Sequence, residues 1–567
     1  MSLPGRFGTR GISQYHLQSG NKVTKRCQLT SLAHQPSKTV EQSPAVQEEW
    51  PDDPRFSDWP KPRKFSDIAA DKVCGTLQDV MLHARRAVQA PHSANLRLEP
   101  KHDSQGSTSA TVSVQSSKPV VLVLGSGWAA HSFIKVIDTE KFDVVVVSPR
   151  NHFIFTPMLP SSAVGTVEYR SLLEPVRISN PYVSYIEASC EVVDMEKKVA
   201  LCMASVAYES GQKPEFEVLW DLLVMAVGEQ TATFGVPGVE DHCFFMKEIT
   251  DSVRLRRRIV ECFELAALPG ASEAQKRKAV HFVVVGGGPT GVEFAGALED
   301  FLHGDLARKP GYCKLMPYVQ VTLLQHAHSV LTMFTEELQE RALVALRQEG
   351  VHVRLGVRVV AVTQDQVILE GGEHIAYGAC VWSAGNAAVP IVQAVARQLP
   401  QQQDLAKGRN PAATKLAVDP FLRIAGARDA LALGDCSRLT GAPLPSTAQV
   451  AAQQGAYAAR MINMGYKLGT GGLHEKFPCR TIKEDGKVDW YKKPFEFLPL
   501  GFMAYLGRDK AVTHLEAGKL NFDTAGYLSF LIWRSVYLTK QVSTRNRILI
   551  FWDWIKTRAF GRDVSNF

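Results

Sequence analysis

The stretch KPVVLVLGSGWAAHSFIKVIDTEKFDVVVVSPR, residues 118–150, decides the fold. An apolar run at Val120–Leu124 predicts a buried parallel strand, a helix follows it, and Val144–Val147 predicts a second buried strand. The turn between the first strand and the helix carries the pattern GxGxxA at residues 125–130. A strand, a glycine-rich turn, a helix and a second strand form the βαβ unit of a dinucleotide-binding domain.

Each small residue of this turn has its own task. Gly125 permits the tight turn, Gly127 lets backbone amides approach a pyrophosphate at the helix N-terminus, and Ala130 lets the helix pack closely. The glycine pattern alone also occurs in ordinary turns, so it is the flanking strands that favour a dinucleotide site.

The chain repeats this arrangement once. Val283–Val285 predicts another buried strand, the pattern GxGxxG follows at Gly286, Gly288 and Gly291, and a further strand is expected at Val319–Leu324. Two such units predict that two dinucleotides are bound together. The simplest chemical interpretation is a flavin enzyme, with the flavin held permanently and a nicotinamide dinucleotide exchanged as substrate.

Composition and charge argue against several other classes of protein. The 567 residues are too many for one ordinary domain, and a hydrophobic content of 45% can form large cores. The net charge of +7 is mild for this length and gives no reason to expect nucleic acid as a partner. Ten cysteines occur without a CxxC pair, which favours a reducing compartment. No apolar run reaches the roughly 18 residues that a membrane-spanning helix needs.

The N-terminal region predicts targeting rather than chemistry. Residues 1–40 contain basic residues, Ser and Thr but no Asp or Glu, which is typical of an organelle transit peptide, with a disordered basic tail as the alternative. Residues 66–89 predict one helix, and residues 103–117 predict a Ser/Thr-rich linker. We therefore expect the folded core to begin close to Lys118.

Residues 155–177, FTPMLPSSAVGTVEYRSLLEPVR, resemble a segment of the type II NADH dehydrogenases, the single-chain alternative NADH:quinone oxidoreductases. In that family the segment runs along the FAD, so the resemblance implies that Thr156 and Pro157 lie beside the flavin. The preceding strand ends in Ser148 instead of the usual acidic ribose ligand, and the family also commonly reads SPR there.

Three further motifs are similar to motifs of the same family. Ala226-Val227-Gly228 resembles the ATG motif where the chain leaves the FAD domain for the NAD domain. The turn WSAGN at residues 382–386 resembles the return crossing, and the resemblance implies that Gly385 lies close to the nicotinamide. The run ALALGD ends in Asp435, which by resemblance hydrogen-bonds the ribityl chain of FAD, although an isolated Asp at a strand end is usually a helix cap.

The second glycine-rich turn and the start of its helix read GGGPTGVEFAGAL, which is similar to the corresponding motif of the family. Glu293 occupies the position at which the family usually has glutamate. A carboxylate two residues beyond Gly291 is expected in the first turn of the helix, where it can reach the nicotinamide ribose or amide and remain near the flavin. The alternative is an acidic side chain that only complements the helix dipole.

The segment STAQVAAQQG, residues 446–455, matches the family's AQxAxQ quinone motif. Gln449 and Gln453 are four residues apart, so on a helix both amides face the same side and can donate to a quinone carbonyl. The alternative is a polar helix face that packs on the flavin. The resemblance favours the quinone.

Nucleotide choice depends on the end of the strand expected at Val319–Gln325. NADH-specific enzymes normally place Glu or Asp there, because a carboxylate accepts from the ribose diol and repels a 2′-phosphate. Here the residue is Gln325, which carries no charge. We expect NADH to be preferred, with a reduced penalty against NADPH.

The C-terminal residues 526–567 combine aromatic, aliphatic and basic side chains. One strip at helical spacing contains Ile548, Phe551, Trp552 and Ile555, and a second contains Ile550 and Trp554. One strip can bury against protein and the other in lipid. A homodimer interface is the alternative, and the family uses this region both for pairing and for membrane attachment.

We therefore expect an α/β flavoprotein with two nested Rossmann-like dinucleotide-binding domains and a C-terminal amphipathic helical region that anchors it to a membrane. The expected segments are residues 1–117 for the transit peptide and extension, 118–270 and 389–465 for the FAD domain, 271–388 for the NAD(P)H domain, 466–525 for strands of the FAD domain, and 526–567 for the anchor.

The reaction implied by the resemblance passes a hydride from NADH to FAD and two electrons to a membrane quinone. A flavoprotein disulfide reductase is the first rival, but residues 148–177 contain no cysteine. A non-catalytic FAD-binding protein is the second. No calcium-binding loop or other metal site is expected. We expect peripheral attachment to the mitochondrial inner membrane, as part of a respiratory chain, with the plastid thylakoid membrane as the alternative.

Overall fold

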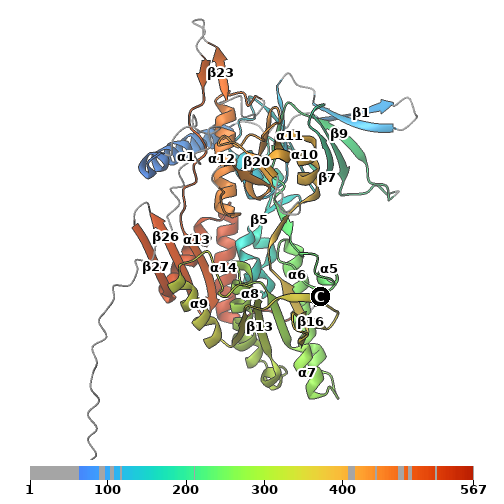
Figure 1. Ribbon diagram of the computed structural model, residues 1–567, viewed down its shortest axis with the longest axis vertical. Coiled ribbons are helices and arrows are strands. Elements are labelled where there is room, and N and C mark those ends of the chain that lie inside the picture. The colour runs from blue at the N-terminus through green and yellow to red at the C-terminus, as the bar shows by residue number, and fades with distance from the viewer. Residues whose placement is uncertain are drawn as a thin grey trace, which may run out of the picture. The chain divides into compact units, whose positions relative to one another are not determined.

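The computed structural model describes residues 63–88, 96–102, 108–114, 118–209, 211–406, 415–440, 443–469, 478–482, 488–517 and 520–565 (Figure 1). All of them belong to one compact unit, Glu48–Phe567. The transit peptide predicted in residues 1–40 lies outside the described residues.

The first sheet contains nine strands in the order β1-β2-β9-β8-β7-β4-β3-β10-β21. Its first four strands are β1 (Leu96–His102), β2 (Thr108–Val114), β9 (Glu215–Leu219) and β8 (Val199–Ala204). The last five strands of this order are parallel and form one end of the sheet, with β21 at its edge. These strands are β7 (Ser184–Asp194), β4 (Asp143–Ser148), β3 (Val120–Leu124), β10 (Leu222–Met225) and β21 (Ala430–Ala432). The strand β21 therefore joins β10 only after the chain has built a second domain in between.

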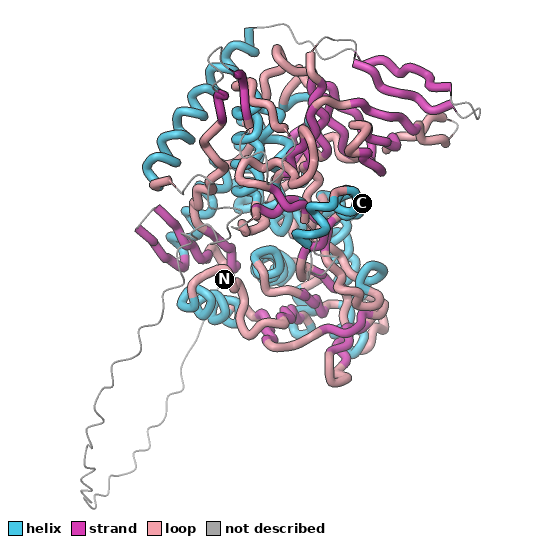
Figure 2. Tube along the Cα trace, turned by 45° about the horizontal axis from the view of Figure 1, so that its top comes forward, coloured by secondary structure: helices cyan, strands magenta, loops and turns pink. Residues whose placement is uncertain are grey.

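That second domain contains a four-stranded parallel sheet in the order β14-β13-β12-β18. Its strands are β14 (Val351–Leu355), β13 (Gln320–Gln325), β12 (His281–Val285) and β18 (Ala379–Trp382). The chain enters through β11 (Glu229–Thr231) and returns through β19 (Asn386–Ala388), and these two short strands pair antiparallel. Figure 2 shows the strands of the two sheets as separate groups. The nested arrangement expected from the sequence is confirmed.

The core of the first domain follows from the apolar run that opens it. Val121, Leu122 and Val123 of β3 have no exposed surface, and burying one such side chain stabilises a fold by about 1.5–3 kcal/mol. Helix α2 (Trp128–Val136) covers this sheet and packs against α12 (Ala448–Asn463). The two helices meet at Gly455, where an added Cβ would lie 2.2 Å from the carbonyl oxygen of Ala129.

The C-terminal part forms a three-stranded antiparallel sheet followed by two helices. These elements are β25 (Phe502–Gly507), β26 (Lys510–Ala517), β27 (Leu520–Gly526), α13 (Tyr527–Thr539) and α14 (Thr544–Phe560). Ile550 and Trp554 of α14 are buried, whereas Ile548, Phe551 and Trp552 are 53–63% exposed. Of the two apolar strips expected on this helix, the second therefore packs on protein and the first faces outward. Among the described helices, none is long and apolar enough to cross a membrane.

The folded core begins earlier than Lys118, so that expectation is wrong. The predicted helix is present as α1 (Phe65–Val88), and residues 108–114 of the expected linker form β2, which pairs with β9 (Glu215–Leu219). Arg63 forms an ion pair of 2.7 Å with Glu496, and Asp79 pairs with Arg460 of α12 at 2.5 Å. Charged side chains far apart in sequence hold α1, and such contacts leave no periodic signal in the sequence.

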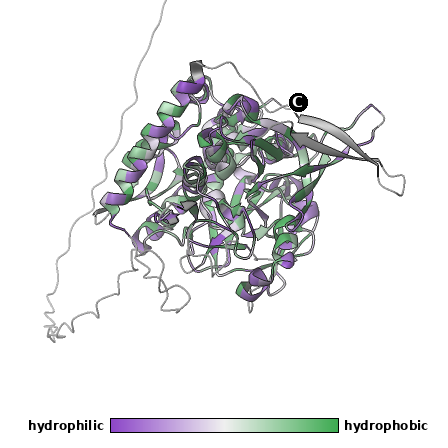
Figure 3. Cartoon of the chain, turned by 90° about the horizontal axis from the view of Figure 1, so that it is seen from above, coloured by the Kyte–Doolittle hydropathy of each residue, from purple (hydrophilic) through white to green (hydrophobic). Residues whose placement is uncertain are grey.

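Four apolar residues of α1 form a face that points away from the protein. Val73, Leu77, Val80 and Met81 are 58–64% exposed, although their spacing is that of one helix face. Figure 3 shows α1 as the long helix at the upper left, with apolar (green) and polar (purple) residues interleaved along it. Helix α1 therefore binds the rest of the protein through its polar side chains.

Candidate active site

The first glycine-rich turn has the geometry that a bound dinucleotide requires. Gly125 has φ +114°, and an added Cβ there would lie 2.4 Å from the carbonyl oxygen of Ala226, so only glycine fits. A Cβ on Gly127 would meet nothing within 4 Å, which leaves space in front of the N-terminus of α2. Ala130 is fully buried behind it. Open space at a helix N-terminus fits a pyrophosphate.

The second turn, before helix α8 (Pro289–Glu299), repeats these features. Gly286 has φ +115°, and a Cβ there would lie 2.8 Å from the backbone of Ser383. A Cβ on Gly288 would meet nothing within 4 Å, and one on Gly291 would lie 2.0 Å from the carbonyl oxygen of Gly286. The chain thus has two glycine-rich turns that can each bind a dinucleotide, one at the carboxyl edge of each parallel sheet.

Thr156 and Pro157 lie in the short 3-10 helix Thr156–Met158 and are held from the first turn. The indole Nε1 of Trp128 donates to Thr156 Oγ1 at 3.0 Å. The Trp128 ring also packs on Phe153 with a centroid separation of 4.9 Å. Trp128 therefore links the first glycine-rich turn to the segment that the resemblance places beside the flavin.

Asp435 follows β21 in the turn Gly434–Cys436. Burial raises the pKa of its carboxyl and the carboxylate of Glu229 adds to this, while Lys247 and Lys415 act in the opposite direction. Within the part of the chain that the structure describes, no group donates a hydrogen bond to this carboxylate. A partly buried acceptor with no protein donor fits a ligand hydroxyl, such as one on the ribityl chain of a flavin.

The two crossings between the domains bring Gly228 and Gly385 to the β11 and β19 ribbon. Gly228 precedes β11 and Gly385 precedes β19, and the amide of Ala232 donates to the carbonyl of Gly385 at 3.3 Å. A Cβ on Gly385 would lie 2.3 Å from the Phe234 ring, whereas one on Gly228 would meet nothing within 4 Å. Both glycines therefore lie where the expected nucleotide sites of the two domains adjoin.

Glu293 faces β25 and α13. Its Oε1 accepts from the backbone amide of Tyr505 and from Nε1 of Trp533, each at 3.1 Å. Burial raises the pKa of the Glu293 carboxyl to about 8, although these two hydrogen bonds oppose the shift. The close approach depends on Gly296, where a Cβ would lie 2.5 Å from the backbone of Leu506. The carboxyl is mostly protonated at neutral pH, in a buried setting that does not suit an acid serving only the helix dipole.

Gln449 and Gln453 lie on one side of α12 and bind the same backbone segment. The Gln449 amide donates to Gly501 O at 2.9 Å and accepts from Leu500 N at 3.3 Å. The Gln453 amide donates to Leu498 O at 2.9 Å and accepts from Leu498 N at 3.0 Å. Each carboxamide has two N–H groups, so one N–H on each side chain has no acceptor among the described residues.

Gln325 closes the second glycine-rich turn. Its Oε1 accepts from the amide of Gly287 at 2.9 Å, and its Nε2 donates to Ser329 O at 3.2 Å. The neutral amide therefore has a structural task at the end of β13, where a carboxylate could make the first of these bonds but not the second.

The structure adds two residues to the site, Trp128 and Gln454, that were not predicted from the sequence. Trp128 falls on a variable position of GxGxxA, and Gln454 follows Gln453 in the quinone motif. Gln454 is buried, and its Oε1 accepts from the amide of Gly434 at 2.6 Å. In the sequence, Gln454 could have been noticed as a polar residue directly after Gln453 that falls on a different face of the expected helix.

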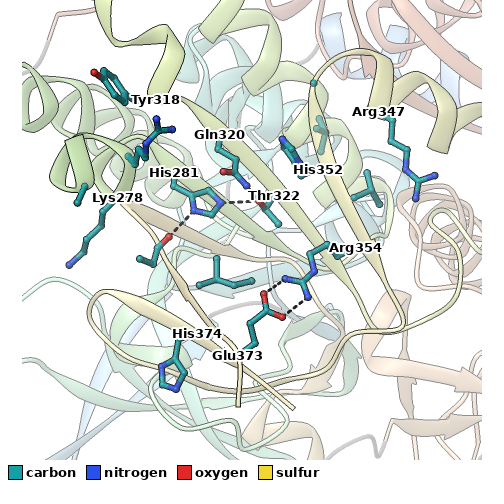
Figure 4. A pocket seen from close by; sticks show the side chains of 17 residues that line it. Lys278, His281, Tyr318, Gln320, Thr322, Arg347, His352, Arg354, Glu373 and His374 are labelled. Carbon is teal, nitrogen blue, oxygen red and sulfur yellow. Dashed lines mark hydrogen bonds and ion pairs between the residues drawn. The ribbon is translucent and has the colours of Figure 1, made fainter. Parts of the chain in front are cut away.

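A separate cavity of about 780 Å³ lies at the opposite, amino-terminal edge of the second sheet (Figure 4). His281 lines it, with Nδ1 2.7 Å from Ala376 O and Nε2 2.8 Å from Thr322 Oγ1. Arg354 and Glu373 form a two-pronged ion pair across it. None of the residues predicted for the site lines this cavity. No group of three or more potential metal ligands occurs in the described residues.

Comparison with known proteins identifies the class of protein to which this chain belongs. The family model described as pyridine nucleotide-disulphide oxidoreductase matches residues 119–455, and the model described as NDH2 C-terminal domain matches residues 500–563. The first match covers more than half of the chain. The protein is therefore a member of the pyridine nucleotide-dependent flavoprotein class that carries two nested nucleotide domains.

The curated relatives narrow this class. The internal alternative NAD(P)H-ubiquinone oxidoreductase A1, mitochondrial, of Solanum tuberosum is 39% identical over 461 residues, which cover 79% of this chain and 88% of the relative. The Arabidopsis thaliana protein of the same name is 37% identical over 510 residues, which cover 88% and 94%. The chain belongs to the type II, or alternative, NADH:quinone oxidoreductase family, as the motifs predicted.

A solved structure agrees with the fold. The structure of NDH2 from Plasmodium falciparum in complex with NADH has a TM-score of 0.68 and 23% sequence identity, and the match covers 79% of this chain and all of that one. At this identity the likeness concerns the fold alone.

The raised pKa of Glu293 predicts a specific dependence of stability on pH. An unfolded glutamate titrates near 4.5 and the folded one near 8, so the folded state keeps a proton that the unfolded chain loses between these values. The free energy of unfolding therefore falls as pH rises through this window and levels off above it. Glu293→Gln keeps the acceptor oxygen and removes the titration. Relative to wild type, the variant should gain up to a few kcal/mol between pH 5 and pH 9.

Thermal melting of wild type and variant at both pH values checks this. An unchanged difference in melting temperature between the two proteins would contradict the buried, protonated assignment.

Proposed function

We propose that this protein oxidises NADH and reduces a membrane quinone through a bound FAD. One observation carries the proposal: two glycine-rich turns with open space at their helix N-termini face the β11 and β19 crossing from two nested parallel sheets. Membership of the type II family supplies the reaction class. When bound, FAD supplies the two-electron carrier between the nicotinamide and the quinone.

The chain's own residues have separate tasks in this proposal. Gly125, Gly127, Ala130, Thr156, Pro157, Gly228 and Asp435 hold the FAD, and Gly286, Gly288, Gly291, Gln325 and Gly385 hold the nicotinamide dinucleotide. The Asp435 carboxylate is the acceptor for a cofactor hydroxyl, because it has no protein donor among the described residues. Trp128 orients Thr156 through its indole N–H.

Gln449 and Gln453 contact the quinone in this proposal. Their bonds to residues 498–501 fix both amides, and each keeps one N–H that can donate to a quinone carbonyl. Glu293 holds a proton at Oε2, because Oε1 already accepts two hydrogen bonds. Reduction of a quinone to a quinol consumes two protons. We therefore keep Glu293 in the proposed catalytic set, as a group that contacts the nicotinamide ribose or amide near the flavin and whose buried carboxyl also holds a proton.

Attachment and location form the outer part of the proposal. The exposed strip of α14 lies in a lipid surface, the same helices pair two copies of the chain, and the protein is peripheral to the mitochondrial inner membrane. The two relatives described above are both named as mitochondrial. The six segments expected from the sequence remain the proposed domain organisation, with α1 and β2 added to the folded part of the first.

The quinone assignment predicts a split between the two half-reactions. Gln453→Leu removes one amide, and we expect NADH to reduce the flavin within about twofold of the wild-type rate while quinone reduction slows roughly tenfold or more. Stopped-flow measurement of each half-reaction tests this. Equal losses in both halves would place Gln453 in the flavin site instead.

Nucleotide choice is tested at Gln325. Because no carboxylate repels a 2′-phosphate, NADH and NADPH should differ in kcat/KM by no more than about a hundredfold. Gln325→Glu should suppress NADPH turnover and leave NADH nearly unchanged, since a carboxylate still accepts from Gly287 N. The variant loses the bond to Ser329 O, so its melting temperature is the control. Wild type that already rejects NADPH as completely as the variant would contradict this interpretation.

Membrane attachment is tested on the outward strip of α14. Deleting residues 526–567 would remove Trp533 and Ile550 from the core, so point variants are cleaner. Phe551→Ser with Trp552→Ser should release the protein from anionic liposomes in a flotation assay, because buried aromatic surface drives interfacial binding. Leu268→Ser, on the exposed Leu268 after α6 (Ile249–Ala267), is the matched control. Undiminished flotation of the double variant would assign attachment to another surface.

A further inference from the structure

We propose that Lys72, on helix α1 of the N-terminal extension, is a positioning residue for quinone reduction that acts through Gln453. This inference rests on the proposed function, because it requires Gln453 to contact the quinone. It gives the extension, in which the sequence indicated no chemistry, a task in the reaction.

The contact is direct and sets the orientation of the amide. Lys72 Nζ donates to Gln453 Oε1 at 2.5 Å, and Leu498 N donates to the same oxygen at 3.0 Å. A flipped amide would present its NH₂ group to the ammonium and to the Leu498 N–H, so that orientation is excluded. Nε2 is thereby fixed with one N–H on Leu498 O and the other left for a ligand.

The neighbouring glutamine provides an internal comparison. Gln449 makes the same two kinds of backbone bond, to Gly501 O and Leu500 N, but no cation among the described residues contacts its oxygen. Of the two, Gln453 alone receives a charged donor from the described part of the chain, and this donor polarises the carbonyl and strengthens the amide N–H groups as donors. The two amides of the motif are therefore unequal, and Lys72 makes the difference.

Contacts on both sides of Lys72 fix α1 to the rest of the protein. Arg63 bonds Glu496 just before the helix, and Asp79 bonds Arg460 two turns after Lys72. Gly75 lies against the Arg460 guanidinium, where an added Cβ would be 2.7 Å from Cζ. Val73, Leu77, Val80 and Met81 contribute little to this docking, because they face outward.

Lys72 lies among groups that make its charge sensitive to pH. Burial is the main cause that lowers the pKa of its ammonium to about 8, Arg460 and Arg63 add to this, and Glu496 opposes it. The Phe495 ring lies 5.7 Å from Nζ on the remaining side. Asp79, Asp71 and Lys493 are the next charges outward, and they pair with Arg460 and Arg63 or with one another. Loss of the lysine proton above pH 8 removes the charged donor from Gln453.

The test compares four full-length variants: Lys72→Met, Lys72→Arg, Gln453→Leu and, as a matched control, Lys493→Met. Lys493 also bonds α1, through Asp71 at 2.9 Å, but does not touch Gln453. FAD content and melting temperature confirm folding of each variant. Stopped-flow measurement then follows flavin reduction by NADH and its reoxidation by a short-chain ubiquinone from pH 6 to pH 10.

We expect Lys72→Met to leave flavin reduction within about twofold and to raise the KM for quinone roughly tenfold. Quinone reduction in wild type should decline above about pH 8, a decline that Lys72→Met removes and Lys72→Arg moves to higher pH. Lys493→Met should behave as wild type. A purely structural role for Lys72 would lower activity without changing the pH profile, and that result would overturn the inference.

The double variant separates this inference from the proposed function. Lys72→Met with Gln453→Leu should be no slower than Gln453→Leu alone, because Lys72 acts through that amide. Additive losses would overturn the inference. Slow Gln453→Leu together with unimpaired Lys72→Met overturns the role of Lys72 and leaves the quinone site standing. Wild-type quinone reduction in Gln453→Leu overturns the proposed site and the role of Lys72 with it.

Discussion

The parallel pairing of β10 with β21 is the contact on which the rest of the structure depends. Met225 of β10 lies opposite Ala432 of β21, and the amide of Leu433 bonds Met225 O at 2.9 Å. This register brings the turn with Asp435 to the carboxyl edge of the sheet that already carries the first glycine-rich turn. Helix α12 follows this turn along the chain and packs on α2, so the placement of both quinone-motif glutamines depends on the same pairing.

Helix α12 connects the two halves of the proposed chemistry through its two faces. Buried Gln454 bonds the amide of Gly434 on the cofactor side, and Gln449 and Gln453 bond residues 498–501 on the other. The single helix α12 therefore lies between the backbone turn that contains Asp435 and the segment bound by the two glutamines assigned to the quinone. Helix α1 reinforces only the second face, through Lys72 and the Asp79 pair with Arg460.

Features that depend on local pattern could be predicted from the sequence. Both glycine-rich turns and the two strips of α14 were predicted, because backbone geometry and helical period leave direct traces in neighbouring residues. The docking of α1 could not be predicted, since its Arg63 bond to Glu496 joins residues 433 positions apart. The surroundings of Glu293 were missed for a related reason: its partners Tyr505 and Trp533 come from β25 and α13. The linker expected at residues 103–117 was wrong because residues 108–114 of this Ser/Thr-rich run form β2, which pairs with β1 on one side and with β9 on the other.

The same strand pairing sets a condition on how the chain can be made. Synthesis proceeds at about 5–20 residues per second, so roughly ten to forty seconds pass between the emergence of Met225 and that of Ala430. Throughout that interval one edge of β10 has no partner strand, and an unpaired apolar edge is a template for aggregation. The sheet of the nicotinamide domain is complete within residues 281–382. This domain can therefore fold before β21 is available to complete the sheet of the flavin domain. The edge of β10 is therefore open to aggregation in newly made chains and covered by β21 in mature ones.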